Sequence, residues 1–321
     1  VDTVPPPVPG LIAPENNTWV NATPTYFWSS VDDNSKPIRY RIQVAIDKDF
    51  TGVHADSGWI LENFWTVSPA LYEGDPFYWH VKARDNAGNE STWALWWVNK
   101  ADTTAPSKVN LYSPENQLST NQTTVTFEWE HASDYPGYNW YSGLENYIIQ
   151  IATDPDFNNL IENDNVPATD NTYVYTFTAD NVYYWRVRAI DKVGNGGAWA
   201  DNFWVRIDTL PPQGVQLTYP DNNQKIPDNT PDLKWTAGQD NSTPILYKVV
   251  ITYDNGDNVF ESDWLTDNWL DNSTYLPDNW YYWYIISKDN AGNQTQTDNW
   301  RFGVETQPPN VPTLYEPVPN A

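Results

Sequence analysis

The side chains best suited to hold a ligand are aspartates that recur at matching places along the chain. They follow short aromatic segments or precede proline-rich ones, at Asp32, Asp33, Asp102, Asp134, Asp208 and Asp240. Calcium takes about six to eight oxygen ligands, which loops can supply where they converge. We therefore predict calcium sites where the loop after an early strand meets a neighbouring linker. The alternative is that these aspartates only cap turns.

A second set of aspartates opens a five-residue motif that occurs three times, DNAGN at 85–89, DKVGN at 191–195 and DNAGN at 289–293. Glycine at the fourth place supplies the positive φ that a tight turn needs, and aspartate can accept hydrogen bonds from its own backbone. We predict turns that lead into the last strand of each repeat. Asp85, Asp191 and Asp289 belong to the acidic loops but not to the predicted ligand set.

Catalytic patterns are missing from the sequence. There is no Ser-His-Asp set, no paired carboxylate motif and no H-E-x-x-H cluster. We interpret the three histidines, His54, His80 and His131, as solvated surface groups. The chain has no cysteine, so neither a disulfide nor a thiolate is available. The sequence thus predicts a protein that is not an enzyme and that has no cofactor, calcium excepted.

Two further kinds of site face the exterior. An insertion at residues 133–145 carries Tyr135, Tyr138, Trp140 and Tyr141, which could stack on a glycan, dock a partner, or fold back over the end of the domain. Sequons for N-glycosylation occur at Asn16, Asn21, Asn89, Asn121, Asn241, Asn272 and Asn293. Most fall in predicted loops or turns, where a glycan is tolerated.

The elements that must position these residues are short strands with apolar side chains at alternate places. An early strand contains Tyr26 and Trp28, Phe127 and Trp129, or Leu233 and Trp235. The next has Tyr40, Ile42, Val44 and Ile46 facing inward, and a later one Phe77, Trp79, Val81 and Ala83, each with counterparts in the other repeats. The outer face of the later strand has His80, Lys82 and Arg84, or Arg186 and Arg188, and is predicted to be wet.

Linkers with the same composition separate these repeats. Asp-Thr or Glu-Thr precedes prolines at residues 2–6, 102–106, 208–212 and 305–309. Proline cannot donate to a sheet ladder, so these stretches mark boundaries. We predict three modules in an extended row, at residues 1–103, 104–209 and 210–306, followed by residues 307–321.

The Tyr-Trp-x-Val-x-Ala-x-Asp strand, the Ala-Gly-Asn turn and the Asp-Thr-x-x-Pro linker resemble the tandem repeats, fibronectin-III-like or bacterial Ig-like, of large prokaryotic surface proteins. The resemblance covers the whole chain. It implies an all-β fold of three β-sandwich modules with Greek-key connections and an extracellular location. It also implies a tyrosine corner at Tyr183 and Tyr281, which Phe77 in the first repeat lacks.

Charge excludes one class of partner. The formal charge is −25, from 42 acidic and 17 basic residues, which would repel a phosphate backbone. We therefore expect no nucleic-acid binding. No apolar run approaches the roughly 18 residues of a membrane span.

The two ends of the chain match parts of a repeat. Val1 to Thr3 corresponds to the end of a preceding module, and residues 311–317, with Val311, Leu314 and Tyr315, correspond to an opening strand. An isolated strand exposes unpaired backbone groups. It belongs either to a further module or to an assembly tail that pairs with another copy.

Three functions fit the sequence. The first is a structural rod that forms or decorates a cell-surface filament, sheath or surface layer through self-association or contact with neighbouring modules. The second is an adhesin stalk that binds glycan or partner cells. The third is a row of accessory modules in a larger secreted enzyme.

Overall fold

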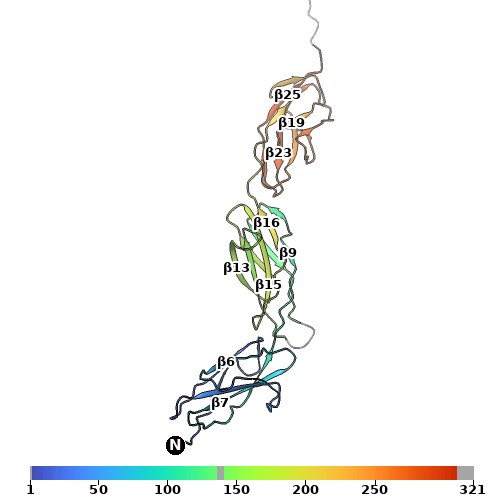
Figure 1. Ribbon diagram of the computed structural model, residues 1–321. Coiled ribbons are helices and arrows are strands. Elements are labelled where there is room, and N and C mark those ends of the chain that lie inside the picture. The colour runs from blue at the N-terminus through green and yellow to red at the C-terminus, as the bar shows by residue number, and fades with distance from the viewer. Residues whose placement is uncertain (1, 136–140, 309–321) are drawn as a thin grey trace, which may run out of the picture. The chain divides into compact units, whose positions relative to one another are not determined.

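The chain is all-β. The computed structural model describes residues 2–135 and 141–308. Within these ranges the regular elements are β-strands, and no helix there could cross a membrane. The strands form six sheets, which group as three pairs of one small and one large sheet (Figure 1). This confirms the predicted fold class, which is all-β with three tandem β-sandwich modules.

The first module is built from eight strands: β1 (Leu11–Ala13), β2 (Thr18–Val20), β3 (Thr25–Trp28), β4 (Arg39–Ala45), β5 (Val53–Asp56), β6 (Phe64–Thr66), β7 (Pro76–Arg84) and β8 (Trp97–Ala101). The small sheet has the order β1-β3-β6 and the large one β2-β8-β7-β4-β5. Pairing is antiparallel except between β2 and β8, which run parallel.

The second module repeats this plan with β9 (Leu111–Ser113), β10 (Leu118–Thr120), β11 (Thr124–Trp129), β12 (Leu144–Ala152), β13 (Leu160–Pro167), β14 (Thr172–Thr176), β15 (Asn181–Asp191) and β16 (Phe203–Ile207). Its sheets have the orders β14-β11-β9 and β10-β16-β15-β12-β13. As in the first module, a short early strand, here β10, runs parallel to the last one, β16.

The third module consists of β17 (Leu217–Tyr219), β18 (Gln224–Ile226), β19 (Leu233–Trp235), β20 (Leu246–Thr252), β21 (Asn258–Glu261), β22 (Trp269–Leu270), β23 (Asn279–Lys288), β24 (Gln294–Gln296) and β25 (Trp300–Val304). Its sheets have the orders β17-β19-β22 and β18-β25-β23-β20-β21, with β24 paired to β23.

Each module has a core made by the two facing sheets. In the first module Trp28 of β3 and Trp79 of β7 are both fully buried, and the Tyr26 ring lies 4.8 Å from that of Trp79. The register places Ile42 opposite Val81 and Val44 opposite Trp79. Alternate residues of both strands therefore face the other sheet. Truncation of such a buried aromatic residue to alanine costs about 3–5 kcal/mol.

The turns predicted from the five-residue motif and the tyrosine corner implied by the resemblance are both present. Gly88, Gly194 and Gly292 have φ values of 97°, 91° and 99°. The hydroxyl of Tyr183 donates to the carbonyl of Ala179 at 2.8 Å, and that of Tyr281 to Pro277 at 2.7 Å. At the equivalent place in the first module, the Phe77 ring packs against His54 and Tyr72 instead.

Two burial predictions are wrong. Ile46 is 41% exposed, because β4 ends at Ala45 and the alternation stops there. His80 is only 7% exposed, because its ring is stacked between Phe50, 3.5 Å away, and Trp93, 3.8 Å away. Burial, together with the nearby charge of Lys82, lowers the pKa of His80 to about 4.

The charged side chains of the outer face also lie on aromatic rings. The Arg186 guanidinium is 4.0 Å from the ring centre of Phe157 and 4.3 Å from that of Trp199. Arg84 lies 4.3 Å from Trp59 in the same manner. Such contacts stabilise by about 0.5–1 kcal/mol each at exposed sites. The face is therefore a ladder of stacked side chains rather than a layer of freely solvated charges.

Compact units of the chain do not coincide with the modules. Residues up to 113 group with 126–173 and 184–203, and residues 114–125 group with 174–183 and those from 204 onward. The strands β11, β14 and β15 each contain residues of both units. The predicted boundaries after residues 103, 209 and 306 stay predictions.

Candidate metal centres

Three clusters of aspartates bring together residues that are far apart in the sequence. We call them the first, second and third aspartate clusters: Asp2, Asp33 and Asp85; Asp102, Asp134 and Asp191; Asp208, Asp240 and Asp289. In each cluster one carboxylate oxygen from every member lies within 4.8 Å of the others. Each cluster takes one aspartate from a linker, one from a loop and one from a turn.

The turn aspartate is fixed by the five-residue motif. Asp289 follows β23, and its Oδ1 accepts hydrogen bonds from the backbone N–H groups of Gly292 at 2.7 Å and Asn293 at 2.9 Å. The Asn293 side chain donates to its Oδ2 at 2.8 Å. Asp85 with Asn89, and Asp191 with Asn195, repeat this arrangement. The motif therefore positions a carboxylate as well as turning the chain.

The linker aspartate is held through its backbone. The N–H of Asp208 donates to the carbonyl of Thr120 at 3.0 Å, and its own carbonyl accepts from the Asn293 side chain at 2.8 Å. The same asparagine thus contacts both the turn and the linker aspartate. Asp102 is bound in the same way by Val20 and Asn195, at 2.9 Å and 3.1 Å.

The loop aspartate is positioned by a buried tyrosine of the first long strand of each module, which is β4, β12 or β20. The Tyr247 hydroxyl accepts from the N–H of Gly238 at 2.8 Å, just before Asp240. Tyr147 and Tyr40 hold the equivalent loops through Ala132 and Val31. Asp240 itself accepts from the N–H of Ser242 at 2.6 Å.

The threonines of three linkers each have a separate partner. Thr209 donates through its N–H and its hydroxyl to the carboxylate of Asp180, at 3.0 Å and 3.1 Å. Thr103 bonds Glu73 and Thr306 bonds Asp278 in the same way. The two internal Asp-Thr pairs therefore have a physical basis. Asp102 and Asp208 each join a carboxylate cluster, and the threonine that follows is bound by an acidic side chain of the loop before β7 or β15.

The clusters carry concentrated negative charge. Burial raises the pKa of Asp208 to about 6, and the nearby carboxylate of Asp240 adds to the shift. Burial likewise raises the pKa of Asp134 to about 6, with Asp102 contributing. Among the ion pairs of the described residues, none joins a lysine or arginine to a cluster member. A proton or a cation is therefore the means left to neutralise the second and third clusters.

The first cluster differs in its electrostatics. Burial acts to raise the pKa of Asp85, but hydrogen bonds from Asn89 and from backbone N–H groups outweigh it and hold the pKa below its ordinary value. Asp2 and Asp33 are also only half-buried, whereas both Asp102 and Asp134 are buried. Water therefore screens the first cluster more than the second.

The structure brings five of the six predicted ligand residues into clusters, and Asp32 is the exception. Asp32 is exposed and pairs with Lys36 at 2.8 Å. The residues missing from the predicted set are Asp2 and the turn aspartates. Asparagine at the end of each turn motif was the signal, because its side chain can bond a second segment. Calcium binding itself stays a prediction.

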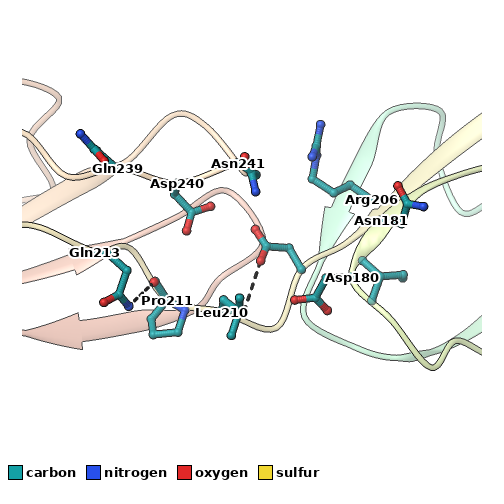
Figure 2. Close-up of a pocket in the computed structure, with 11 residues that line it drawn as sticks. Asp180, Asn181, Arg206, Leu210, Pro211, Gln213, Gln239, Asp240 and Asn241 are labelled. Atoms are coloured by element: carbon teal, nitrogen blue, oxygen red, sulfur yellow. Dashed lines mark hydrogen bonds between the residues drawn. The ribbon is translucent and has the colours of Figure 1, made fainter.

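The third cluster borders a pocket. Figure 2 shows Asp240 and Asn241 on one side of it and Asp180, Asn181 and Arg206 on the other. Asp208 and Leu210 also line it. Solvent therefore reaches the neighbourhood of the cluster through a polar opening.

The remaining predicted sites differ in accessibility. Tyr135 and Tyr141 are 54% and 40% exposed, with ring centres 5.4 Å apart and edge to face. Tyr138 and Trp140 lie outside the described residues, as do Val311, Leu314 and Tyr315 of the tail.

Among the sequons, three asparagines donate hydrogen bonds through Nδ2, the atom to which a glycan would be attached. Asn272 is only 2% exposed, and its Nδ2 donates to Thr274. Asn89 and Asn293 use Nδ2 to bind the aspartate clusters. A glycan on any of these three nitrogens would remove these bonds. Asn16, Asn21 and Asn241 are exposed and Asn121 is half-buried.

Comparisons with known proteins add little. No protein-family model matches the chain, and no curated protein matches it. Among solved structures, the FN1-FN3 domains of chicken CNTN1 are 15% identical, over 94% of this chain and 99% of that one, with a TM-score of 0.34. The fibronectin(III)-like modules of Clostridium thermocellum CbhA are 15% identical, over 61% and 94%, with a TM-score of 0.36. Similarities this weak carry no argument, so the assignment of the fold depends on the strand pairing and the side-chain burial described above.

Proposed function

We propose that this chain is a structural part of a large prokaryotic surface protein, in which tandem modules form or decorate an extracellular filament, sheath or surface layer. The modules act through their number, their stability and their contacts with copies or neighbours. Calcium is the one cofactor in this proposal.

The observation that supports it most is the construction of the linkers. Asp102 and Asp208 make hydrogen bonds through their N–H and through their carbonyl, and the threonine that follows each one is bound by an acidic side chain. A flexible tether between independent binding domains would be free of such bonds and rich in glycine and serine. The repeated residues are thus used to fix the chain between modules.

The composition supports the same function. Without cysteine, each module depends on packing around two buried tryptophans, such as Trp235 and Trp283 in the third module. A net charge of −25 keeps the exterior strongly hydrated. Both properties suit a protein that persists outside the cell.

A binding role is the second candidate, because the second module presents an exposed aromatic pair. Tyr135 and Tyr141 lie edge to face at the insertion, and both residues are exposed. Aromatic faces of this kind stack on sugars or on a partner protein. In this case the chain would be an adhesin stalk that binds a glycan.

Electron microscopy of native cell-surface material, labelled with antibodies against this chain, tests the proposal. Label along ordered fibres or layers is the expected result. Label on isolated stalks, together with glycan binding that Tyr141→Ala abolishes, would favour the adhesin. Label that follows a secreted enzyme activity would favour accessory modules and overturn the structural role.

A further inference from the structure

We propose that the third aspartate cluster, Asp208, Asp240 and Asp289, is a binding site for one calcium ion. The inference concerns a site formed by the linker aspartate Asp208 and two aspartates of the third module, and it does not rest on the proposed function.

Asp208 has a buried carboxylate oxygen without a hydrogen-bond partner. Asp208 is only 6% exposed, and its Oδ2 accepts no hydrogen bond, whereas its Oδ1 accepts one from the N–H of Leu210. A buried, charged oxygen without a hydrogen-bond partner is destabilising unless a cation or a proton lies opposite it. The Asp240 carboxylate is its neighbour, and two carboxylates repel each other.

The spacing of the carboxylate oxygens also supports a shared ion. One oxygen from each of the three carboxylates lies within 4.8 Å of the other two. Calcium binds oxygen at about 2.3–2.6 Å, so two ligands on opposite sides of the ion are about 4.6–5.2 Å apart. The three oxygens are therefore close enough to one another to be ligands of one ion. Carboxylates that already accept hydrogen bonds keep lone pairs for a metal.

The chemistry of the donor atoms indicates which metal ion the cluster would bind. All three are hard oxygen ligands from carboxylates, and neither histidine nor cysteine takes part. This set selects calcium or magnesium over zinc and copper. Calcium tolerates irregular coordination by flexible loops, while magnesium demands a near-octahedral shell. The polar pocket beside Asp240 leaves room for the water ligands that complete the shell (Figure 2).

The competing occupant is a proton shared by Asp208 and Asp240. It would relieve the repulsion of that pair at acidic pH, but it leaves the charge of Asp289 in place. A divalent ion neutralises more of the cluster and remains at neutral pH. The two occupants can be told apart by counting ions.

The experiment uses the full chain, freed of metal with a chelator and titrated with CaCl₂ at neutral pH. Bound ions are counted by native mass spectrometry and by calorimetry, for the wild type, for Asp240→Asn, and for Asp267→Asn as the control. Asp267 is an exposed aspartate of the same module, so its substitution makes the same change in charge away from the cluster.

We expect Asp240→Asn to bind one calcium ion fewer than the wild type and Asp267→Asn to bind as many. A rise in the melting temperature on addition of calcium should be smaller in Asp240→Asn by the contribution of that ion. Asp208→Asn, whose amide oxygen can still accept from Leu210, repeats the test if Asp240→Asn fails to fold.

The proposal is overturned if the wild type binds no calcium at millimolar concentration, which would leave the shared proton as the occupant. It is also overturned if Asp240→Asn and Asp208→Asn, both folded, bind as many ions as the wild type. The second cluster is the natural site for any additional ion, because Asp102 and Asp191 are buried there as Asp208 and Asp289 are here.

Discussion

Acid should weaken the first module through His80. Its pKa falls from 6.5 to about 4 in the folded chain, because protonation would place a charge between two aromatic rings and beside Lys82. The folded state therefore binds the proton less readily than the unfolded state. The stabilising effect is complete above the unfolded pKa and is lost as the pH falls from 6.5 through about 4. With about 1.4 kcal/mol per pKa unit, the full loss is about 3 kcal/mol, of which about 2 kcal/mol is lost by pH 5.

Hydrogen exchange in low concentrations of urea, followed by mass spectrometry of peptides that cover β7, measures the opening free energy of this module. We expect the wild type to lose about 2 kcal/mol more than His80→Gln between pH 7 and pH 5, by the linkage just given. Glutamine keeps a polar group near Gln43, which lies 3.2 Å from the histidine Nε2, but it does not titrate. Asp56 does not confuse the comparison, because its pKa is about 2. Equal losses of opening free energy in the two proteins would show that protonation of His80 does not destabilise the module.

Three further results are expected. Tyr281→Phe should destabilise the third module by about 1 kcal/mol in urea unfolding, because the bond to Pro277 is lost, while Tyr282→Phe, on the other face of β23, should not. Trp199→Ala should destabilise the second module by about 1–2 kcal/mol, because it removes the stacking of the ring on two arginines. An unchanged melting temperature would show that this stacking does not stabilise the module. In a glycosylating host, peptide mapping should find Asn272 bare and Asn241 available; a glycan on Asn272 in the folded protein would contradict its burial.

The fold was predictable because a period of two leaves little choice of face. Trp79, Val81 and Ala83 lie inside as the alternation requires. Where a strand ends is not encoded in this way, and Ile46 falls outside for that reason. The burial of His80 was also not predictable, since it depends on the rings of Phe50 and Trp93, which two loops bring from other parts of the sequence.

The candidate site was predictable in part. Linker and loop aspartates such as Asp208 and Asp240 stand at repeated positions, and the structure places them together. The sequence does not place Asp289 in the predicted ligand set, because the turn motif alone accounts for an aspartate at that position. The structure shows that one carboxylate does both, since Asn293 satisfies the turn and bonds the linker as well. Such a double role depends on distances between segments, which spacing along the chain does not report.

If the linkers are fixed parts of the molecule, the amide hydrogen of Thr209 must be protected from exchange with solvent. Its exchange rate is therefore the measurement to make. The Thr209 N–H donates to Asp180 at 3.0 Å. We expect protection like that of the adjoining strand β16, lost in Asp180→Ala while the strand stays protected. Exchange of the Thr209 amide at the rate of an unstructured peptide in the wild type would contradict the account.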